Sequence, residues 1–351
     1  METSVMISVV MPTYNTPVEM LREAVDSILK QTYGNFEFII IDDGSSNDSD
    51  AYLKSLTDER VRIIRNPVNI GITKSLNIGL KNARGKYIAR MDADDISMPT
   101  RFEKQLAYME KHPNVLICGT RNTFLIQNGD QWEVKNDNKR RRRDRHMDME
   151  WYRITALFTY PGPVHPSVFI SRKAVDRFNL FYDESLAYAQ DYDLYVRASK
   201  AGDICTLDEA LLCCRHHAGR ISQARKNEQA RFDQITQRKL LEELLGDVSD
   251  EELDFFYTYS RSEYSSKVIS RQVKEAYGRL TEANQSKGIY NQRKLKRYID
   301  EKILKRLIWQ TFTADMTKTE KAKLFFMYLP VSSAVKAVME SILVKLRNQA
   351  G

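Results

Sequence analysis

Short apolar runs alternate with helical patterns over the first 126 residues of this 351-residue chain. The apolar runs predict strands at residues 6–11, 36–41, 61–65, 87–91 and 115–118. The segments between them predict helices, and the first of these helices has Leu21, Ala24, Val25, Ile28 and Leu29 at helical spacing. Because strand–helix–strand repetition places parallel strands side by side, the pattern predicts an α/β fold with a mostly parallel sheet flanked by helices.

The pattern changes after residue 126. Residues 127–150 are polar and charged without an apolar period, and we expect a mobile loop there. Strands are predicted at residues 167–172 and 210–214, with a helix at 191–201 between them. From about residue 220 glycine is rare and leucine, lysine, glutamate and arginine dominate, which predicts an α-helical C-terminal region. We therefore expect a catalytic domain at residues 1–220 and a helical region at 221–351.

Composition places the chain among globular proteins, with 42% hydrophobic and 29% charged residues. No window of about 18 uncharged apolar residues occurs, and the first residues lack a basic segment, so we expect neither a transmembrane helix nor a signal peptide. The four cysteines lack metal-ligand spacing, which predicts free thiols in a reduced cytoplasm. They are Cys118, Cys205, Cys213 and Cys214.

Part of the net charge of +7 is concentrated at residues 139–145, KRRRRDR. The chain contains no recognisable nucleic-acid-binding module, so we expect no nucleic-acid partner. The basic run fits an anionic membrane surface, a phosphorylated acceptor or a solvated loop. Residues 323–347 carry an apolar stripe interleaved with lysines, which fits a membrane surface, a packed core helix or a homodimer helix.

Polar residues follow three of the predicted strands, where ligands bind in parallel α/β sheets. Asp92, Asp94 and Asp95 follow the fourth strand. Carboxylates are the ligands that hard divalent cations prefer, and a cation held there would neutralise a departing diphosphate. A solvated acidic loop is the alternative.

Other candidates follow neighbouring strands or begin helices. Asp42 and Asp43 can accept a base N–H or cap a helix, and Tyr14 can stack on a nucleobase or pack in its loop. Lys74, in a first helical turn, can meet a phosphate or remain exposed. Asp191 can take a proton from a hydroxyl or serve as an N-terminal helix charge. The histidines His165, His216 and His217 are structural or contact a ligand.

Together these motifs resemble family 2 of the glycosyltransferases, which have the GT-A fold. The matching segments are VVMPTYN, SILKQTYGNFEFIIIDDGSSNDS, NPVNIGITKSLNIGL, GKYIARMDADDISMPTRFEKQ and AQDYDLYVR. They occur in the family's order and span roughly residues 5–220. The resemblance implies a metal-dependent, inverting hexosyltransferase that moves one sugar from a nucleotide-diphosphate donor, usually a UDP-sugar, to an acceptor hydroxyl.

The resemblance also implies roles for individual residues. Pro12, Thr13 and Tyr14 would line the base pocket, and Asp43 would bind the base edge. Asp92 and Asp94 fit the family's DxD signature, with Asp94 facing the ribose or metal and Asp95 facing the metal. The cofactor would be Mn²⁺ or Mg²⁺. Asp191 matches the catalytic base, and His165 falls in a loop that approaches the acceptor.

Some positions depart from the family pattern. Gln190 replaces the acidic neighbour of the base, which leaves the acceptor in doubt. The QxxRW motif of processive synthases is absent, which favours addition of a single sugar. Leu76 replaces the usual phosphate-side arginine, and Lys74 is the substitute. Family habit implies capsule, O-antigen or glycolipid assembly on a lipid-linked acceptor, by a cytoplasmic protein peripheral to the inner face of the membrane.

Three other classes of protein fit the sequence less well. A sugar-nucleotide nucleotidyltransferase requires a glycine-rich loop after the first strand, where this chain has PTYNTP, which contains no glycine. A dinucleotide-dependent oxidoreductase requires the motif GxGxxG at the same turn, and this turn lacks it. A catalytically degenerate transferase serving as an assembly partner would not need the intact aspartates.

Overall fold

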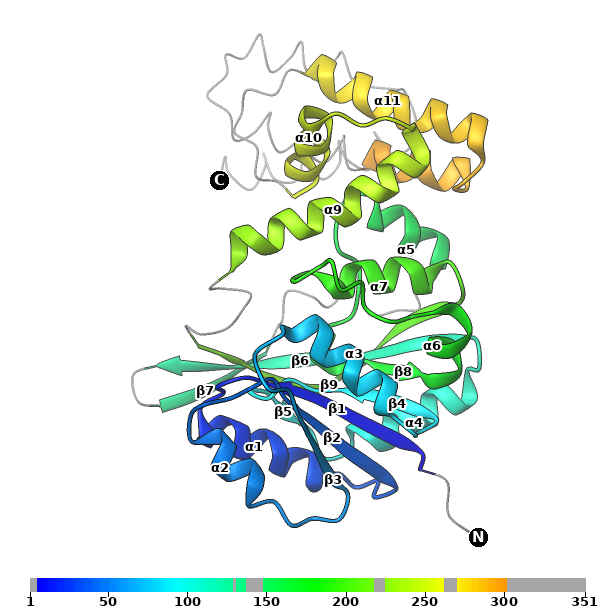
Figure 1. Ribbon diagram of the computed structural model, residues 1–351. Helices are drawn as coiled ribbons and strands as arrows, with labels where there is room; N and C mark the ends of the chain where they lie inside the picture. The colour runs from blue at the N-terminus through cyan, green and yellow to red at the C-terminus, as the bar shows by residue number, and fades with distance from the viewer. Residues whose placement is uncertain (1–4, 129–130, 137–147, 218–224, 262–269, 302–351) are drawn as a thin grey trace, which may run out of the picture. The chain divides into compact units, whose positions relative to one another are not determined.

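The computed structural model describes residues 5–128, 131–136, 148–217, 225–261 and 270–301 (Figure 1). The chain divides into two compact units, Met1–Glu242 and Glu243–Gly351. Among the described residues after 220, the helices α9 (Lys226–Leu245), α10 (Asp250–Arg261) and α11 (Ser270–Lys287) agree with the predicted helical C-terminal region. The roles predicted for the two domains stay predictions.

The described strands of the first unit form one sheet in the order β3-β2-β1-β4-β8-β6-β9-β5, with β7 paired to β6. Their bounds are β1 Ile7–Thr13, β2 Phe36–Asp42, β3 Val61–Arg65, β4 Tyr87–Arg90, β5 Ile96–Ser97, β6 Val115–Asn128, β7 Gln131–Asn136, β8 Phe169–Ser171 and β9 Asp203–His216. The predicted α/β fold is therefore confirmed.

Parallel pairing is confined to particular parts of this sheet. β1 pairs in parallel with β2 and β4, and β2 pairs in parallel with β3, as the alternating pattern predicts. β6 and β9 are also parallel. β8 runs antiparallel to β4 and β6, and β5 runs antiparallel to β9. The sheet is thus parallel in its N-terminal half and mixed beyond β4.

Helices cover both faces of the sheet. They are α1 Val18–Leu29, α2 Ser49–Lys54, α3 Ile72–Asn82, α4 Arg101–Lys111, α5 Met149–Ala156, α6 Arg172–Phe178 and α7 Gln190–Ser199. One core packs α1, α2 and α4 against alternate residues of β1 and β2, including Val9 and Phe38. The other packs α3, α5, α6 and α7 against the opposite face, including Val10 and Ile39 (Figure 1). β1, β2 and β4 are buried on both faces, which explains their mostly apolar sequences.

The prediction of a loop at residues 127–150 is wrong for part of that segment. β6 continues to Asn128 and pairs with β7 as an antiparallel hairpin, and α5 begins at Met149. The hairpin extends beyond the helix-covered sheet (Figure 1). Val134 on β7 is 64% exposed, so this hairpin buries too little to show an apolar period. The basic run 139–145 lies outside the described residues.

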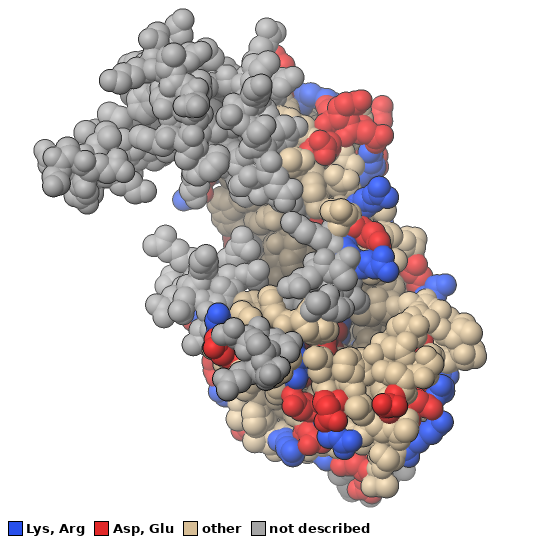
Figure 2. Space-filling view, turned by 90° about the vertical axis from the view of Figure 1, so that its left-hand side faces the viewer, with Lys and Arg blue, Asp and Glu red and all other residues tan. Residues whose placement is uncertain are grey.

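Surface properties agree with a globular chain. No helix among the described residues has the length and apolarity needed to cross a bilayer. On the face drawn in Figure 2, acidic and basic side chains are interspersed over the described surface. The apolar stripe predicted at residues 323–347 lies outside the part of the chain that the structure describes. The four cysteines are buried thiols that form no disulfide bond.

Candidate active site

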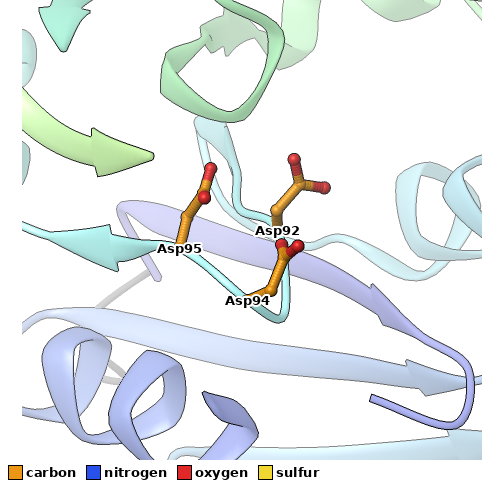
Figure 3. Close-up of side chains that lie close together, drawn as sticks. All are labelled: Asp92, Asp94 and Asp95. Atoms are coloured by element: carbon orange, nitrogen blue, oxygen red, sulfur yellow. The ribbon is translucent and has the colours of Figure 1, made fainter. Parts of the chain in front are cut away.

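Three aspartates converge in the turn between β4 and β5. One carboxylate oxygen from each of Asp92, Asp94 and Asp95 lies within 4.8 Å of the others. Figure 3 shows the three side chains rising from this one turn, with Asp92 and Asp95 pointing to the same side. The turn follows the buried strand β4, so the cluster lies beyond the carboxyl end of the parallel part of the sheet. Clustered carboxylates repel one another unless a cation lies among them.

The end of β9 forms the other wall of this cluster. The antiparallel pairing of β5 with β9 brings the Arg215 backbone N–H to Asp95, where it donates to Oδ1 at 2.9 Å. The Arg215 Nε donates to the Asp94 carbonyl at 2.9 Å, and His217 Nε2 lies 2.8 Å from Asp94 Oδ2. His216 instead packs edge-on against Phe124. Of the predicted histidine pair, it is therefore His217 that lies at the acidic cluster.

Arg90, the last residue of β4, is a buried cation beneath the cluster. Its side chain is only 4% exposed, and its Nη2 lies 2.5 Å from Asp92 Oδ1. Burial opposes the charge on Arg90, but the carboxylates of Asp92 and Asp95 raise its pKa. The same guanidinium acts on Asp191 and on His165, favouring ionised Asp191 and neutral His165. Arg90 therefore couples the acidic cluster electrostatically to the predicted base.

Asp43 organises the loop between β3 and α3. Its carboxylate, 3% exposed, accepts from Asn66 Nδ2 at 2.8 Å and from the backbone N–H groups of Ile70 and Gly71 at 3.0 and 2.9 Å. The adjacent Gly44 has φ +78°, and an added Cβ would lie 2.8 Å from the Val68 carbonyl carbon. Three of about four lone-pair positions on Asp43 are occupied, which leaves one for a base N–H.

Substituting Asp43 by alanine should destabilise the fold. Three hydrogen bonds to a buried carboxylate would be lost, and we expect the free energy of unfolding to fall by about 2–4 kcal/mol. Urea denaturation measures this. Asp48→Ala is the matched control, because Asp48 precedes α2 and makes no side-chain cap hydrogen bond. Equal midpoints for the two variants would contradict the structural role of Asp43.

The remaining predicted donor residues lie at the ends of neighbouring elements. Pro12 and Thr13 end β1 and are buried, whereas Tyr14 is 49% exposed. The Asp43 backbone N–H donates to the Thr13 carbonyl at 2.8 Å, which joins the loops after β1 and β2. Lys74 is exposed in the first turn of α3. Their positions suit contact with a nucleotide beyond the strand ends.

Asp191 lies in the first turn of α7, after Ala189 in the left-handed conformation. The Tyr160 hydroxyl lies 2.7 Å from Asp191 Oδ2, and the Tyr192 backbone N–H donates to Oδ1 at 3.0 Å. Burial raises the pKa of Asp191, although the Tyr160 hydrogen bond and the charge of Arg90 oppose the rise. A raised carboxyl pKa suits a group that must take up a proton near neutral pH.

The residues predicted to meet the acceptor lie in the surroundings of Asp191. His165 opens the short 3-10 helix His165–Ser167, and its Nε2 lies 2.8 Å from the Tyr182 hydroxyl. Burial, with the charge of Arg90, holds the pKa of His165 well below its usual value, so its ring is neutral. Gln190 begins α7 and is buried. His165 therefore has a structural partner in Tyr182.

The acidic cluster fits a hard divalent cation by its donor set. Asp94 and Asp95 offer carboxylate oxygens, and the His217 imidazole lies beside them. Oxygen donors with one imidazole suit Mg²⁺ or Mn²⁺ better than soft metals. Asp92 is instead held by Arg90. The site can therefore stabilise a diphosphate at the cluster and accept a proton at Asp191.

Two residues of this site, Arg90 and Tyr160, are not among those predicted from the sequence. Arg90 had a signal, because an arginine in the otherwise apolar run YIARM is unusual for a buried strand and needs a counter-charge. Tyr160 had no such signal in the sequence, because 31 residues separate it from Asp191 and the two residues share no helix or strand. Contacts of that kind depend on tertiary packing.

The α/β sheet, the acidic cluster after β4 and the carboxylate at the start of α7 are the features that the resemblance to glycosyltransferases predicts. Residues 8–169 match the family model described as glycosyl transferase family 2. An uncharacterized glycosyltransferase of Haemophilus influenzae is 33% identical over 246 residues, which cover 65% of this chain and 71% of that protein. The chain belongs to family 2 of the glycosyltransferases.

Two further comparisons agree with this assignment. An uncharacterized glycosyltransferase of Methanocaldococcus jannaschii is 36% identical over 195 residues, covering 55% of this chain and 64% of that protein. The crystal structure of Staphylococcus aureus TarS 1-349 in complex with UDP-GlcNAc matches with a TM-score of 0.55. The match has 18% identity and covers 84% of this chain and 83% of TarS 1-349, so it supports the fold alone.

Proposed function

We propose that the chain transfers a single sugar from a UDP-sugar to an acceptor hydroxyl, with inversion at the anomeric carbon. The observation that carries this proposal is the coupling of two acidic centres through Arg90, with Asp92 in direct contact and Asp191 under the same charge. One centre suits a metal-bound diphosphate and the other suits a general base. TarS, which shares the fold, has been crystallised with UDP-GlcNAc and with UDP.

In the proposed reaction, Asp191 takes the proton of the acceptor hydroxyl as the acceptor oxygen attacks the anomeric carbon. The bond between that carbon and the diphosphate oxygen breaks, and its electron pair leaves with the UDP. Asp191 must be ionised before the step, so the neighbouring Arg90 charge favours the active form. A single displacement of this kind inverts the anomeric configuration.

Asp94 and Asp95 would hold Mn²⁺ or Mg²⁺, with His217 as a neighbouring ligand. When bound, such an ion supplies Lewis-acid stabilisation of the charge on a departing diphosphate. Lys74 and the N-terminus of α3 would add positive potential for the phosphates. Arg90 would keep Asp92 oriented.

Donor recognition would use the ends of β1 and β2. Tyr14, with its exposed ring, would stack on the uracil, while Pro12 and Thr13 shape the wall beneath it. The remaining lone-pair position of Asp43 would accept the base N–H. The loop that Asp43 fixes would then place Lys74 near the phosphates.

The acceptor side is proposed from the family and from His165 and Gln190 near the base. We propose a carbohydrate or lipid-linked acceptor in capsule, O-antigen or glycolipid assembly. The protein would then work in the cytoplasm, peripheral to the inner face of the membrane. A degenerate transferase acting as an assembly partner is the second candidate, and the intact acidic cluster and Asp191 disfavour it.

Thermal unfolding with nucleotide diphosphates tests this function. With Mn²⁺ present, UDP at about 100 times its dissociation constant should raise the melting temperature by about 5 °C, because ligand binding to the folded state stabilises it by mass action. ADP and GDP should shift it less, and EDTA should remove the UDP effect. A chain that no nucleotide diphosphate stabilises in Mn²⁺ would not be the proposed enzyme.

A further inference from the structure

The Tyr160 hydroxyl lies between two acceptors and has only one proton to give. It is 2.7 Å from Asp191 Oδ2 and 2.7 Å from the carbonyl oxygen of Pro163. A phenol donates one hydrogen bond and accepts others, so it cannot donate to both at once. Which acceptor it serves therefore depends on whether the carboxyl of Asp191 carries a proton.

Packing fixes the position of the Tyr160 ring and of its two acceptors. The ring meets Tyr192 edge-on with centroids 5.8 Å apart and Tyr195 at 5.9 Å. An added Cβ on Gly162 would lie 2.2 Å from the Tyr195 ring, so residues around Pro163 pass close against it. The phenol ring and the Pro163 carbonyl are therefore held in place, while the hydroxyl hydrogen can still rotate.

We propose that Tyr160 is a positioning residue for Asp191, with a hydroxyl that turns from Asp191 to the Pro163 carbonyl when Asp191 takes up a proton. With Asp191 ionised, the Tyr160 O–H donates to Oδ2. With the proton on Oδ2, the Asp191 O–H donates to the Tyr160 oxygen, and the Tyr160 O–H turns to Pro163. No proton leaves Tyr160, so the aspartate stays hydrogen-bonded before and after the transfer. The proposal rests on the proposed function of Asp191 as base.

Other groups also act on Asp191, from several elements. Arg90 of β4 favours the ionised form of the carboxyl. Burial raises the pKa values of Tyr152 of α5, Tyr182 of the segment before α7 and Tyr195 of α7, and the charge of Asp191 adds to the rise in each. Among the described residues, the Tyr160 hydroxyl and the Tyr192 backbone N–H hydrogen-bond to the Asp191 carboxylate, and the Tyr160 hydroxyl is the side-chain partner. Tyr152 is a suitable control, because its buried hydroxyl has no hydrogen-bond partner among the described residues.

The first test follows the Tyr160 hydroxyl directly. The full-length chain is labelled with ¹³Cζ-tyrosine, and the Tyr160 resonance is assigned by its loss in Tyr160→Phe. We expect this resonance to move with pH in the wild type, since the phenol changes from pure donor to donor and acceptor. In Asp191→Asn the chemical shift of this resonance should no longer change with pH. A resonance that does not move between about pH 4 and pH 8, or that still moves in Asp191→Asn, overturns the proposal.

The second test is kinetic and uses the nucleotide sugar that gives the fastest UDP release with Mn²⁺. Tyr160→Phe should lower kcat about tenfold near neutral pH, because the ionised base loses a hydrogen bond to a charged group. The acid limb of its pH profile should move to higher pH, since the lost hydrogen bond favours the ionised carboxylate. The acid limb of the Tyr152→Phe pH profile should lie at the same pH as that of the wild type.

The two tests separate failure of Tyr160 from failure of the proposed function. If Asp191→Asn is inactive while Tyr160→Phe keeps the wild-type acid limb, the switch is wrong and the base stands. If Asp191→Asn turns over normally, the base role itself is wrong. An unfolded Tyr160→Phe is recognised by its melting temperature. The test then uses the tyrosine resonance that moves with pH in the wild type and not in Asp191→Asn, and the absence of any such resonance overturns the proposal.

Discussion

The Asp191→Asn variant should release UDP from its sugar donor about 10²–10⁴-fold more slowly than the wild type, while binding UDP with unchanged affinity. General-base catalysis contributes about this factor, and an amide cannot take the acceptor's proton. Asparagine is nearly isosteric, so its Oδ1 can still accept from the Tyr192 N–H while its Nδ2 donates to the Tyr160 oxygen. The measurement is UDP release with Mn²⁺, alongside UDP binding by calorimetry.

The matched control for this variant is Asp176→Asn. Asp176 is exposed on α6 and pairs with Arg172 one helical turn away, so its loss should leave turnover within a factor of about two. If Asp191→Asn and Asp176→Asn behave alike, Asp191 is not the base. The wild-type rate should also fall as the pH drops through the raised pKa of Asp191, because the protonated carboxyl cannot act as a base.

The Asp95→Asn variant should weaken the binding of UDP in Mn²⁺ about 100-fold, which corresponds to about 2.8 kcal/mol. The substitution removes one negative charge from the acidic cluster but retains an oxygen that can accept from the Arg215 N–H. The fold should therefore survive while the cation is held less tightly. Calorimetric titration of UDP with Mn²⁺ and with EDTA separates metal-dependent binding from direct binding.

Asp26→Asn serves as the control for the loss of charge alone. Asp26 lies on α1 and forms an exposed ion pair with Lys30. Its substitution should leave the affinity for UDP in Mn²⁺ unchanged, because exposed pairs contribute little. Wild-type affinity in Asp95→Asn, or equal wild-type affinity in Mn²⁺ and EDTA, would show that the acidic cluster is not the metal site.

The parallel half of the fold was predictable because β1, β2 and β4 are buried on both faces. β2 contains the unbroken apolar run FIII, and helices of clear periodicity separate the strands. The acidic cluster was predictable for the same reason, since Asp92, Asp94 and Asp95 directly follow such a run. Local pattern and tertiary position agree here.

The second half was less predictable because its order depends on long-range pairing. β8 has only three residues and lies between β4 and β6, an insertion that no local pattern specifies. The β6–β7 hairpin exposes Val134 and so lacks the period of a buried strand. Polar residues at 127–150 were therefore interpreted as a loop.

The site shows the same division between local and long-range information. Asp94 could be assigned to a metal from its neighbours in sequence, whereas its contact with His217 spans 123 residues and arises from the β5–β9 pairing. Asp43 was predicted to bind a base, but the structure shows that most of its acceptor capacity holds the loop before α3. The sequence signals a buried charge at Arg90, whereas the contact of Tyr160 with Asp191 appears only once the segment after α5 is placed beside α7.

A crystal structure of the chain grown with Mn²⁺ and UDP tests the account most directly, because Mn²⁺ is located by its anomalous scattering. We expect the ion on the carboxylates of Asp94 and Asp95, bridging to the diphosphate. The Asp191 carboxylate should face the side of the terminal phosphate where the sugar would lie. An ion or UDP bound away from the β4–β5 turn, or Asp191 screened from the diphosphate, would contradict the proposed mechanism.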